Sequence, residues 1–506
     1  MGTRILNLPL ILPLTGLFSL AMLGPALHAF AQGDHSVARV FFYSAVLGLV
    51  LVTVTGLALG GRGRGADAGV RDLAGLFMAY TLMPLLLALP FYEGLETTSY
   101  LNAYVEMVSS LTTTGATLFT DPGRLTDSLH LWRGLVGWLG GLMIWVSAAA
   151  VLAPLHLGGF EVSAQTEDGR AAQRIDQFRR AGSARRIARH GAQLVPVYTG
   201  LTGALWVMLL ICGERPLVAL IHAMSTLATS GISPVGGLPN AGAGVAGEAL
   251  IFLFLGFALS RLTFSSDTAT AAQAGLRDDP ELRFGLGLVA AVALILFLRH
   301  WIAAYDVDEV RRLGRALAAL WGTVFTVLSF LTTTGFESAA WGAARDWSGL
   351  GAPGLVLMGL AIVGGGVATT AGGVKLLRVY ALYLGGRREM ERLLHPSSVG
   401  RAGQSPRRIR REGAFIAWIF FMLFALSLAV VTVLFATLGQ DIEAATVLAI
   451  AALSTTGPLT QAAAGAPIDL LGMGAAAKLL FCAAMVLGRL ETLAIIALMN
   501  PALWRG

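Results

Sequence analysis

The stretch Ser-Leu-Thr-Thr-Thr-Gly-Ala-Thr (SLTTTGAT) occupies residues 110–117 between two long apolar segments, and related stretches occur three more times in the 506-residue chain. All four follow one pattern: a small residue, any residue, leucine, any residue, threonine, a hydroxyl residue and glycine. The last three positions are filled by Thr113, Thr114, Gly115, Thr229, Ser230, Gly231, Thr333, Thr334, Gly335, Thr455, Thr456 and Gly457. A single copy would be explained by close packing of helices through small residues. Four copies at near-equal spacing indicate an internal repeat.

The composition calls for a membrane. The chain is 55% hydrophobic and 13% charged, with a mean hydropathy of +0.70, and a soluble chain cannot keep so much apolar surface from water. Several uncharged runs reach the roughly 20 residues that a membrane-spanning helix needs. They are Ile5–Gln32, Val40–Gly61, Leu73–Tyr92, Gly134–Phe160, Gly191–Gly213, Gly349–Val374 and Gly413–Gln440. The first run is too long for a signal-peptide core and a second follows at once, so we expect it to be retained.

Each motif lies between two apolar runs, which predicts a repeat unit of outer helix, short pore helix, filter loop and inner helix. We therefore expect an all-α polytopic membrane protein with four pore-loop repeats around a pseudo-fourfold pore, preceded by two transmembrane helices. The expected segments are 1–68 for these two helices and 69–187, 188–282, 283–411 and 412–506 for repeats one to four. The second inner helix should be short, because its uncharged core, Ala249–Ser260, ends at Arg261.

The residue types in the motif suit a pathway for a monovalent cation. Backbone at membrane depth that is not helical must be buried in protein or line a wet cavity. Glycine permits φ angles that other residues avoid, so successive carbonyl groups can turn toward one axis. Four such loops would form rings of carbonyl oxygens that replace the water around the ion. The pore helices would add their partially negative C-terminal ends.

The net charge of +6 does not point to nucleic acid, because the arginines are gathered in a few loops between apolar runs. The richest loops are Gly158–His190 and Gly385–Glu412, and arginine-rich loops stay in the cytoplasm. This orientation places the N-terminus in the cytoplasm as well. The two cysteines, Cys212 and Cys482, lie far apart in apolar runs and predict neither a disulfide nor a metal site.

Several stretches resemble the Trk/Ktr/HKT potassium-transporter superfamily, and within it the Trk membrane subunit. They are Ser110–Thr117 (SLTTTGAT), Leu331–Ser338 (LTTTGFES), Thr455–Pro458 (TTGP), Val363–Arg378 (VGGGVATTAGGVKLLR), His395–Val399 (HPSSV) and Gly488–Leu493 (GRLETL). The resemblance covers nearly the whole chain. It implies potassium uptake through a four-repeat pore, by a homodimer that lies in the inner (plasma) membrane of a bacterial cell in contact with membrane lipid.

The resemblance also implies a cytoplasmic partner, a ring of nucleotide-binding regulatory subunits of the RCK type. No glycine-rich dinucleotide fingerprint follows a predicted strand in this sequence, so nucleotide sensing is expected on that other polypeptide. We expect no cofactor in this chain, and K⁺ as the transported ion. The two basic loops are candidate docking surfaces, although the topology rule alone explains them equally well.

A glycine cluster in the third inner segment predicts a gate. Glycine costs about 0.8–1.0 kcal/mol in a helix interior relative to alanine, so a dense cluster should break the helix. In the family, the matching segment is a loop under the filter that obstructs the pore; tight packing against a neighbouring helix is the alternative. The residues assigned to gating are Gly364, Gly365, Gly366, Thr369, Thr370, Gly372, Gly373, Lys375 and Arg489.

Arg489 lies in the last apolar run, where an arginine at mid-membrane costs roughly 2.5–3.5 kcal/mol and normally needs a partner or a wet cavity. The resemblance implies that it faces the pore below the filter, where its charge would raise the barrier for cations. A structural pair with Glu491 is the alternative. The resemblance also matches Glu106 in the first pore helix, which we expect to accept backbone hydrogen bonds near the filter rather than bind the ion.

The filter sequences differ from those of relatives at a few positions. Gly115 favours potassium, because serine at this position accompanies sodium conduction in the family. Glu337 follows the aromatic residue of the third filter, where relatives usually carry a small residue, and would add negative charge at the outer mouth. The second and fourth filters lack the asparagine often found there.

Other functions stay open from the residues alone. A less selective potassium and sodium conductor, or an ion-coupled symporter, would use the same repeats. A secondary carrier with a mid-membrane substrate site should show two broken helices in matching halves, whereas this chain shows one conspicuous glycine break. We expect no enzyme and no catalytic residue, since neither His-Glu-x-x-His nor Gly-x-Ser-x-Gly occurs and the histidines are scattered, with His222 expected to be structural.

Overall fold

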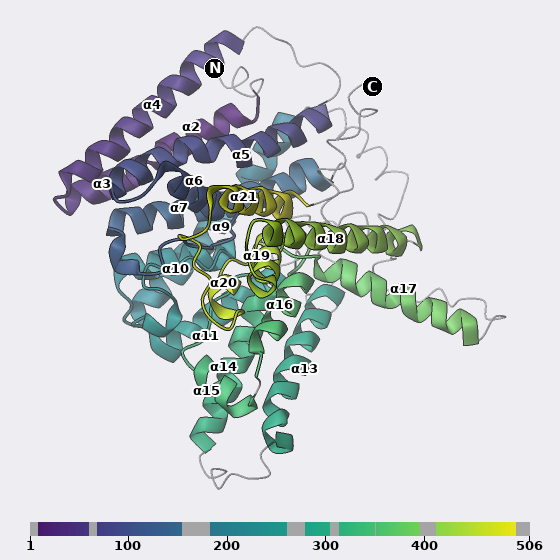
Figure 1. Ribbon diagram of the computed structural model, residues 1–506. Coiled ribbons are helices and arrows are strands. Elements are labelled where there is room, and N and C mark those ends of the chain that lie inside the picture. The colour runs from purple at the N-terminus through teal and green to yellow at the C-terminus, as the bar shows by residue number, and fades with distance from the viewer. Residues whose placement is uncertain are drawn as a thin grey trace.

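The computed structural model describes residues 9–59, 68–153, 183–260, 279–303, 313–349, 351–394 and 411–491, and these ranges contain helices and no strand (Figure 1). Eight of the described helices are long and apolar enough to cross a membrane. The predicted all-α, polytopic fold is therefore confirmed. The basic loops fall mostly outside the described residues, as do His395–Val399 and the last two residues of Gly488–Leu493.

Two spans precede the first repeat, as the sequence predicts. The first consists of α2 (Ile11–Ala21) and α3 (Leu23–Ala31), which meet at Met22, and the second is α4 (His35–Leu59).

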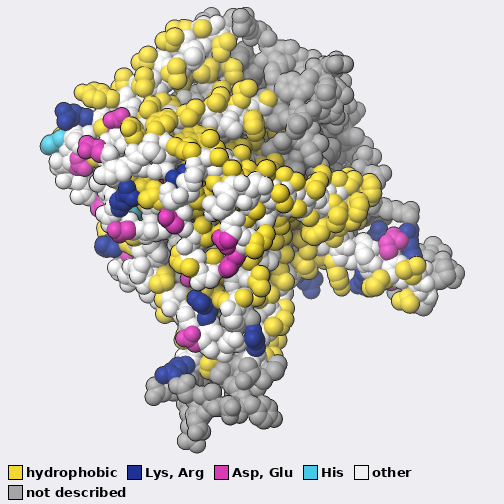
Figure 2. Space-filling view, in the orientation of Figure 1, with side chains coloured by type: hydrophobic (Ala, Val, Ile, Leu, Met, Phe, Trp, Pro, Cys, Tyr) yellow, Lys and Arg dark blue, Asp and Glu magenta, His cyan; other side chains and the backbone are white. Residues whose placement is uncertain are grey.

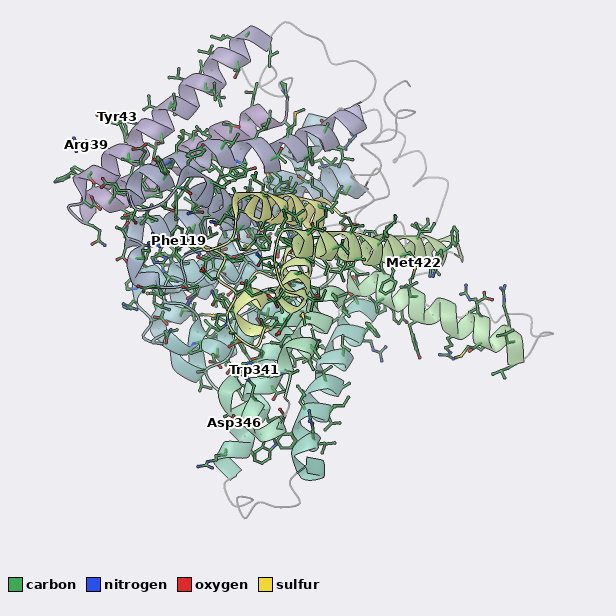
Figure 3. All side chains as sticks on the ribbon, viewed as in Figure 1. Arg39, Tyr43, Phe119, Trp341, Asp346 and Met422 are labelled. Carbon is green, nitrogen blue, oxygen red and sulfur yellow. The ribbon has the colours of Figure 1, made fainter. Side chains whose placement is uncertain are left out.

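Tyr43 on α4 and Met422 on α18 (Arg411–Thr437) lie at the outer edge of the bundle, with 64% and 42% of their surface exposed (Figure 3). Apolar side chains exposed in this way suit contact with lipid.

The four repeats follow in order along the chain. Repeat one comprises α5 (Ala68–Leu95), the pore helix α6 (Tyr100–Leu111) and the inner helix α7 (Asp127–Ser147), which continues as a π-helical turn to Leu152. Repeat two comprises α9 (Ser183–Ile211), the pore helix α10 (Pro216–Ala228) and the inner helix α11 (Gly244–Leu255). As expected, α11 is short; it tightens into a 3₁₀ turn over Gly256–Leu259.

Repeats three and four have additional breaks. Repeat three comprises α13 (Pro280–Ala303), α14 (Leu313–Leu331), α15 (Trp341–Ser348), α16 (Pro353–Val363) and α17 (Leu376–Leu394). Repeat four comprises α18 (Arg411–Thr437), α19 (Ile442–Leu453), the short α20 (Leu459–Ala462) and α21 (Ala475–Leu490). Although α14 is long enough to cross a membrane, it ends at the third filter motif and occupies the place of a pore helix.

Local sequence fixes where the pore helices begin. The side chains of Ser99 and Asp441 cap α6 and α19 by accepting hydrogen bonds from the backbone N–H groups of Asn102 and Ala444. Pro216 occupies the first turn of α10, where its missing N–H costs nothing.

The repeats are joined in a cycle by helix packing. The inner helix α7 packs on the second pore helix α10, α11 packs on α14, α16 packs on α19, and α21 packs on the first pore helix α6. Each inner helix therefore supports the pore helix of the next repeat, and the fourth repeat closes on the first.

The surface is that of a membrane protein. Hydrophobic side chains cover much of the face seen in Figure 2, including α4 and α18, whereas charged side chains lie mainly over its left and lower parts and on α17. Exposed apolar residues such as Leu57 and Leu426 contribute to this surface. An apolar area of this extent marks an interaction with lipid or protein.

Candidate functional site

The four filter motifs share one unusual backbone conformation. Their first threonines, Thr113, Thr229, Thr333 and Thr455, have φ angles of 54°, 50°, 58° and 54°. A positive φ is rare for a β-branched residue. Its recurrence at the same position in all four motifs means that the fold imposes the same turn four times. The glycines were expected to provide this freedom, and the threonines share it.

A common hydrogen bond ends each pore helix. The backbone N–H of the second hydroxyl residue points back to the carbonyl oxygen five residues earlier, as at a Schellman helix end. The pairs are Thr114 to Ser109, Ser230 to Ser225, Thr334 to Ser329 and Thr456 to Ala451, with N···O distances of 2.9, 2.9, 2.9 and 2.8 Å. These bonds tie the start of every filter segment to the end of its own pore helix.

The filter segments meet in a closed order. A Cβ atom added to Gly115 would overlap the carbonyl oxygen of Ser230 in the second motif, and one on Gly231 would overlap that of Thr334 in the third. The same addition to Gly335 would reach Pro458 of the fourth motif at 2.7 Å. A Cβ on Gly457 would overlap Ala116, which returns to the first motif. All four glycines thus lie where only a residue without a side chain fits.

The fourth segment departs from the other three. Gly115, Gly231 and Gly335 have φ angles of 73°, 66° and 80°, whereas Gly457 lies outside the left-handed region. Its N–H donates a 2.6 Å hydrogen bond to the carbonyl oxygen of Thr114. The ring is therefore fourfold in arrangement but not in detail.

Hydroxyl groups tie each filter segment to its pore helix. The side-chain pairs are Thr112 with Thr114 at 2.8 Å, Ser225 with Ser230 at 3.1 Å, Thr332 with Thr334 at 3.2 Å and Ser454 with Thr456 at 3.1 Å. In the second repeat, Ala228 occupies the position of the helix-end hydroxyl, and Ser225 one turn earlier takes its place. This explains why the motif keeps a hydroxyl before every glycine.

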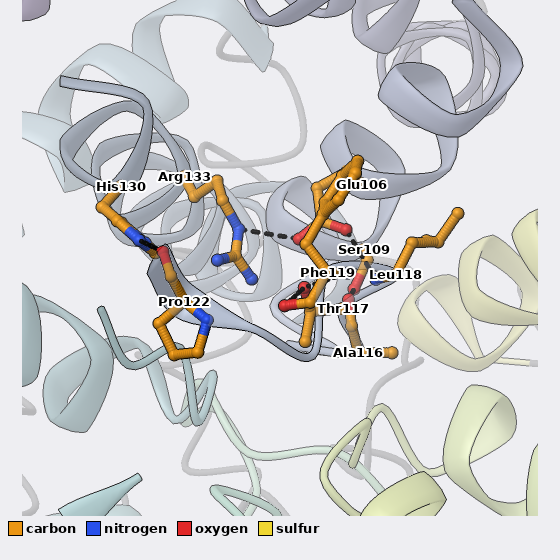
Figure 4. Close-up of polar contacts among 9 residues, drawn as sticks. All are labelled: Glu106, Ser109, Ala116, Thr117, Leu118, Phe119, Pro122, His130 and Arg133. Carbon is orange, nitrogen blue, oxygen red and sulfur yellow. Dashed lines mark hydrogen bonds and ion pairs between the residues drawn. The ribbon is translucent and has the colours of Figure 1, made fainter. Parts of the chain in front are cut away.

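A second set of bonds holds the chain after the filter. The residue nine positions before the glycine is Glu106, His222, Thr326 or Leu448 in the four repeats. Oε2 of Glu106 accepts the N–H of Leu118 at 3.0 Å (Figure 4). His222 lies 2.9 Å from the Ser233 hydroxyl, and Thr326 accepts the N–H of Ser338 at 3.3 Å. The structural roles expected for Glu106 and His222 are in accord with these contacts.

Arg133 is a partner of Glu106 that was not predicted from the sequence. Its Nε lies 2.7 Å from Oε1 of Glu106, and the two side chains are only 4% and 1% exposed (Figure 4). A buried carboxylate is costly unless it is paired. The signal was available, since Arg133 is a charge just before the uncharged run that begins at Gly134.

The glycine cluster breaks the third inner segment, as expected. The helix α16 ends at Val363, since the φ of 74° at Gly364 no longer continues a helix, and α17 begins at Leu376. Within the loop, the N–H groups of Val374 and Lys375 return to the carbonyl oxygens of Ile362 and Val363 at 2.8 and 2.9 Å. The loop is thus folded back against the end of α16.

The loop contacts the threonine level of the filter. Thr370 donates its hydroxyl to the carbonyl oxygen of Leu227 at 3.0 Å and lies 3.2 Å from the hydroxyl of Thr229. The N–H of Gly372 donates to Oγ1 of Thr333 at 2.7 Å, and a Cβ on Gly372 would overlap Thr455. The loop therefore touches three of the four repeats at the same threonine position.

The remaining loop residues hold its shape. Thr369 donates to the carbonyl oxygen of Gly366 at 2.8 Å, and the N–H of Gly366 bonds to Ala258 at 2.9 Å. Cβ atoms on Gly365 and Gly373 would come within 2.5 and 2.6 Å of Ala371 and Ala361. Lys375 donates its ammonium group to the carbonyl oxygen of Ala371.

Arg489 reaches the same loop from the fourth repeat. It lies on α21, is 4% exposed, and donates from Nη1 to the carbonyl oxygen of Thr370 at 2.7 Å. Glu491, the alternative partner considered above, instead pairs with Arg378 at 2.7 Å. Arg378 also lies over the ring of Phe420, with 3.6 Å between its Cζ and the ring centroid.

Glu337 lies beside the third filter segment and is half-buried. Burial raises the pKa of its carboxyl group, and the nearby charge of Arg345 opposes that rise.

Among the described residues, no group of three or more histidine, cysteine, aspartate or glutamate side chains could hold a metal ion. The groups that the four motifs bring together are backbone carbonyl and hydroxyl oxygens.

Comparison with known proteins adds independent observations. Residues 273–504 match the TrkH family, described as "Cation transport protein". The chain is 30% identical to the Trk system potassium uptake protein TrkH of Halomonas elongata, over 99% of this chain and 100% of that protein. It is 30% identical to TrkI of the same organism, over 83% and 80% of the two chains, and 29% identical to TrkH of Salmonella typhimurium, over 99% of each.

A solved structure has the same fold. The crystal structure of the potassium transporter TrkH from Vibrio parahaemolyticus superposes with a TM-score of 0.80 at 24% sequence identity, over 100% of both chains. At this identity the likeness concerns the fold, and it agrees with the polytopic arrangement of pore-loop repeats described above.

Proposed function

Because this chain belongs to the TrkH family of cation transport proteins, we propose that it takes up potassium ions through a single pore built by its four repeats. The ion would exchange its water for backbone carbonyl oxygens of the four filter motifs. The pore helices would direct the negative ends of their dipoles at the same place. The relatives named above are potassium uptake proteins, and the same cargo is proposed here.

The closed order of the four filter glycines carries this proposal. Each glycine abuts the filter segment of the next repeat, with Gly115 against Ser230, Gly231 against Thr334 and Gly457 against Ala116. Four segments in contact around one ring can present oxygens to one ion. Segments that lay apart could not strip water from a cation.

The glycine-rich loop and Arg489 are proposed as the gate. The loop binds filter threonines from two repeats through Thr370 and Gly372, and Arg489 binds the loop. A loop in this position would obstruct the ion on its way from the filter, and the arginine charge would repel it. Movement of the loop would then be required for conduction.

The remaining features follow as parts of the same proposal. The chain would act as a homodimer in the bacterial inner membrane, with its N-terminus in the cytoplasm and a nucleotide-binding regulatory subunit docked on that side. Residues 1–68 would form the N-terminal pair of helices, and 69–187, 188–282, 283–411 and 412–506 the four repeats. The protein would transport ions without catalysing a chemical reaction.

Tracer flux tests the proposal. The purified full chain is reconstituted into lipid vesicles, and uptake of a rubidium tracer is measured with potassium or sodium as competitor. We expect potassium to compete strongly and sodium weakly. Equal competition by sodium would identify a less selective conductor, and a strict need for a sodium or proton gradient would identify a symporter. Absence of uptake in both the wild type and a variant with a weakened loop contact, Thr370→Val, would overturn the proposal.

A further inference from the structure

Glu248 is a buried carboxylate that joins two repeats. It lies on α11, the inner helix of repeat two, and is 4% exposed. Its three hydrogen-bond donors all belong to repeat three. They are Nε1 of Trp321 at 2.8 Å, the hydroxyl of Ser338 at 2.6 Å and the N–H of Ala339 at 2.6 Å.

The geometry uses both carboxylate oxygens. Oε2 accepts from Trp321 and Ser338, and Oε1 accepts from Ala339. Bonds to an ionised acceptor are shorter and stronger than bonds between neutral groups. Burying a carboxylate is unfavourable without such donors, so the three donors and Glu248 hold one another in place.

The segment held by Glu248 directly follows the third filter. Ser338 is three residues after Gly335, and its own N–H is bound by Thr326 of the pore helix at 3.3 Å. The hydroxyl of Ser338 in turn accepts the N–H of Ala340 at 3.1 Å. The chain leaving the filter is thereby fixed to its own pore helix and to the inner helix of the preceding repeat.

In the first repeat a carboxylate also binds the chain after the filter, but it lies on a different helix of the repeat. There Glu106, on the repeat's own pore helix, accepts the N–H of Leu118, three residues after Gly115. In repeat three the equivalent position is Thr326, which carries no charge, and the carboxylate comes from α11 instead. Two carboxylates at unrelated positions in their repeats thus bind the chain just after a filter.

We infer that Glu248 is a positioning residue that fixes the third filter segment and thereby sets its discrimination between potassium and sodium. This inference rests on the proposed function. A functional site must be held to within roughly 0.5 Å to keep its geometry. A filter segment released on its outer side could close around a smaller ion, so selectivity would fall before transport capacity does.

The central variant is Glu248→Gln. The amide keeps the length of the side chain but replaces one acceptor oxygen by an NH₂ group, which must then face either Ala339 or the Trp321 and Ser338 pair. The control is Glu443→Gln, because Glu443 also accepts a backbone N–H, that of Gly465 at 2.8 Å, but is exposed and holds no filter segment. A second pair of variants, Trp321→Phe and Ser338→Ala, removes one donor each and leaves the carboxylate partnered.

The readout is rubidium uptake by reconstituted protein, measured as maximal rate, half-saturation and inhibition by sodium. For Glu248→Gln we expect sodium inhibition to strengthen about tenfold relative to rubidium affinity, since one hydrogen bond to a charged group is worth at least that factor. The maximal rate should change less. Smaller shifts in the same direction are expected for Trp321→Phe and Ser338→Ala, and none for Glu443→Gln.

Each outcome decides the inference. An unchanged ratio of sodium inhibition to rubidium affinity in folded Glu248→Gln would overturn it, whether or not the maximal rate falls. If Glu248→Gln does not yield folded protein, unchanged ratios in both Trp321→Phe and Ser338→Ala would overturn it. A wild type that does not distinguish sodium from rubidium would instead contradict the proposed function, so the two failures are separable.

Discussion

Nη1 of Arg489 lies 2.7 Å from the carbonyl oxygen of Thr370, which joins the last inner helix to the loop that interrupts the third. The hydroxyl of the same threonine is bonded to Leu227 at the end of the second pore helix. Thr370 is thus held from two repeats at once, with a positive charge on one side and a filter segment on the other. Loss of either contact should therefore loosen the loop.

Replacing Arg489 by alanine should raise basal rubidium flux. The change removes both a charge that would oppose cations and the hydrogen bond to Thr370, and one hydrogen bond from a charged group is worth roughly 1.5–3 kcal/mol. We expect an increase of at least about tenfold in vesicles that hold the chain alone. Arg489→Lys keeps the charge, so its flux should lie between those of the wild type and Arg489→Ala. Arg387→Ala, which breaks an exposed ion pair with Glu391, should have wild-type flux. Flux at or below the wild-type level in Arg489→Ala would remove the arginine from the gate.

The Thr370 hydroxyl should hold the loop shut. Thr370→Val preserves the shape of the side chain but removes the bonds to Leu227 and Thr229. Two net hydrogen bonds correspond to roughly a tenfold change in the equilibrium between seated and displaced loop, so basal flux should rise by about that factor. Thr199→Val is the matched control, because the hydroxyl of Thr199 bonds to Val195 within α9, on an exposed face away from the loop. Equal flux from the two variants would mean that the contact with the filter does not hold the loop.

The sequence predicted the parts of the site that depend on local backbone chemistry. Small and hydroxyl residues at fixed spacing identified the four motifs that the structure brings into contact, and the density of glycines located the break after Val363. Such features can be read from a sequence because they concern a few consecutive residues. The expectation for Glu106, which binds the N–H of Leu118, came instead from the family resemblance.

Features that depend on contacts between repeats could not be predicted in this way. Glu248 binds the third filter only because α11 packs on the next pore helix, and nothing near Glu248 in the sequence indicates that neighbour. The pairing of Arg378 with Glu491 likewise joins residues from two repeats. The left-handed conformation of Thr333 and its three counterparts runs against the preference of threonine, so only the folded chain reveals it.

A side chain at Gly115 should disturb ion discrimination. The φ of 73° costs a non-glycine residue roughly 1–2 kcal/mol, and a Cβ would also overlap the carbonyl oxygen of Ser230. Gly115→Ser should therefore weaken the preference for potassium over sodium by about tenfold in competition flux assays. Gly213→Ser is the control, because Gly213 has a φ of 88° but nothing within 4 Å of an added Cβ. Unchanged ion competition in folded Gly115→Ser would contradict the assignment of this residue to the filter.

A methyl group on Gly372 should prevent the loop from seating against the fourth repeat. Its Cβ would overlap the carbonyl oxygen of Ser454 and the hydroxyl of Thr455, and backbone atoms cannot move aside as a flexible side chain can. We expect Gly372→Ala to raise basal flux several-fold, as should shortening the segment Gly364–Gly373. Gly359→Ala, on α16 with open space around an added Cβ, should leave flux unchanged. A reduced flux in Gly372→Ala would mean that the loop opens toward the filter rather than away from it.

The Glu106–Arg133 pair should contribute to stability in a way that only a double-mutant comparison exposes. With 2.7 Å between the charged atoms and both side chains buried, removing one partner leaves an unpaired buried charge, which costs about 3–5 kcal/mol. Arg133→Met should therefore lower the thermal stability of the protein in detergent sharply. Glu106→Gln combined with Arg133→Met should recover much of the loss, because no isolated charge remains and the amide can still accept the N–H of Leu118. Arg387→Met, which breaks the exposed pair with Glu391, should cost no more than about 1 kcal/mol. If the double variant unfolds at the same temperature as Arg133→Met alone, the loss comes from packing of the arginine and not from its charge.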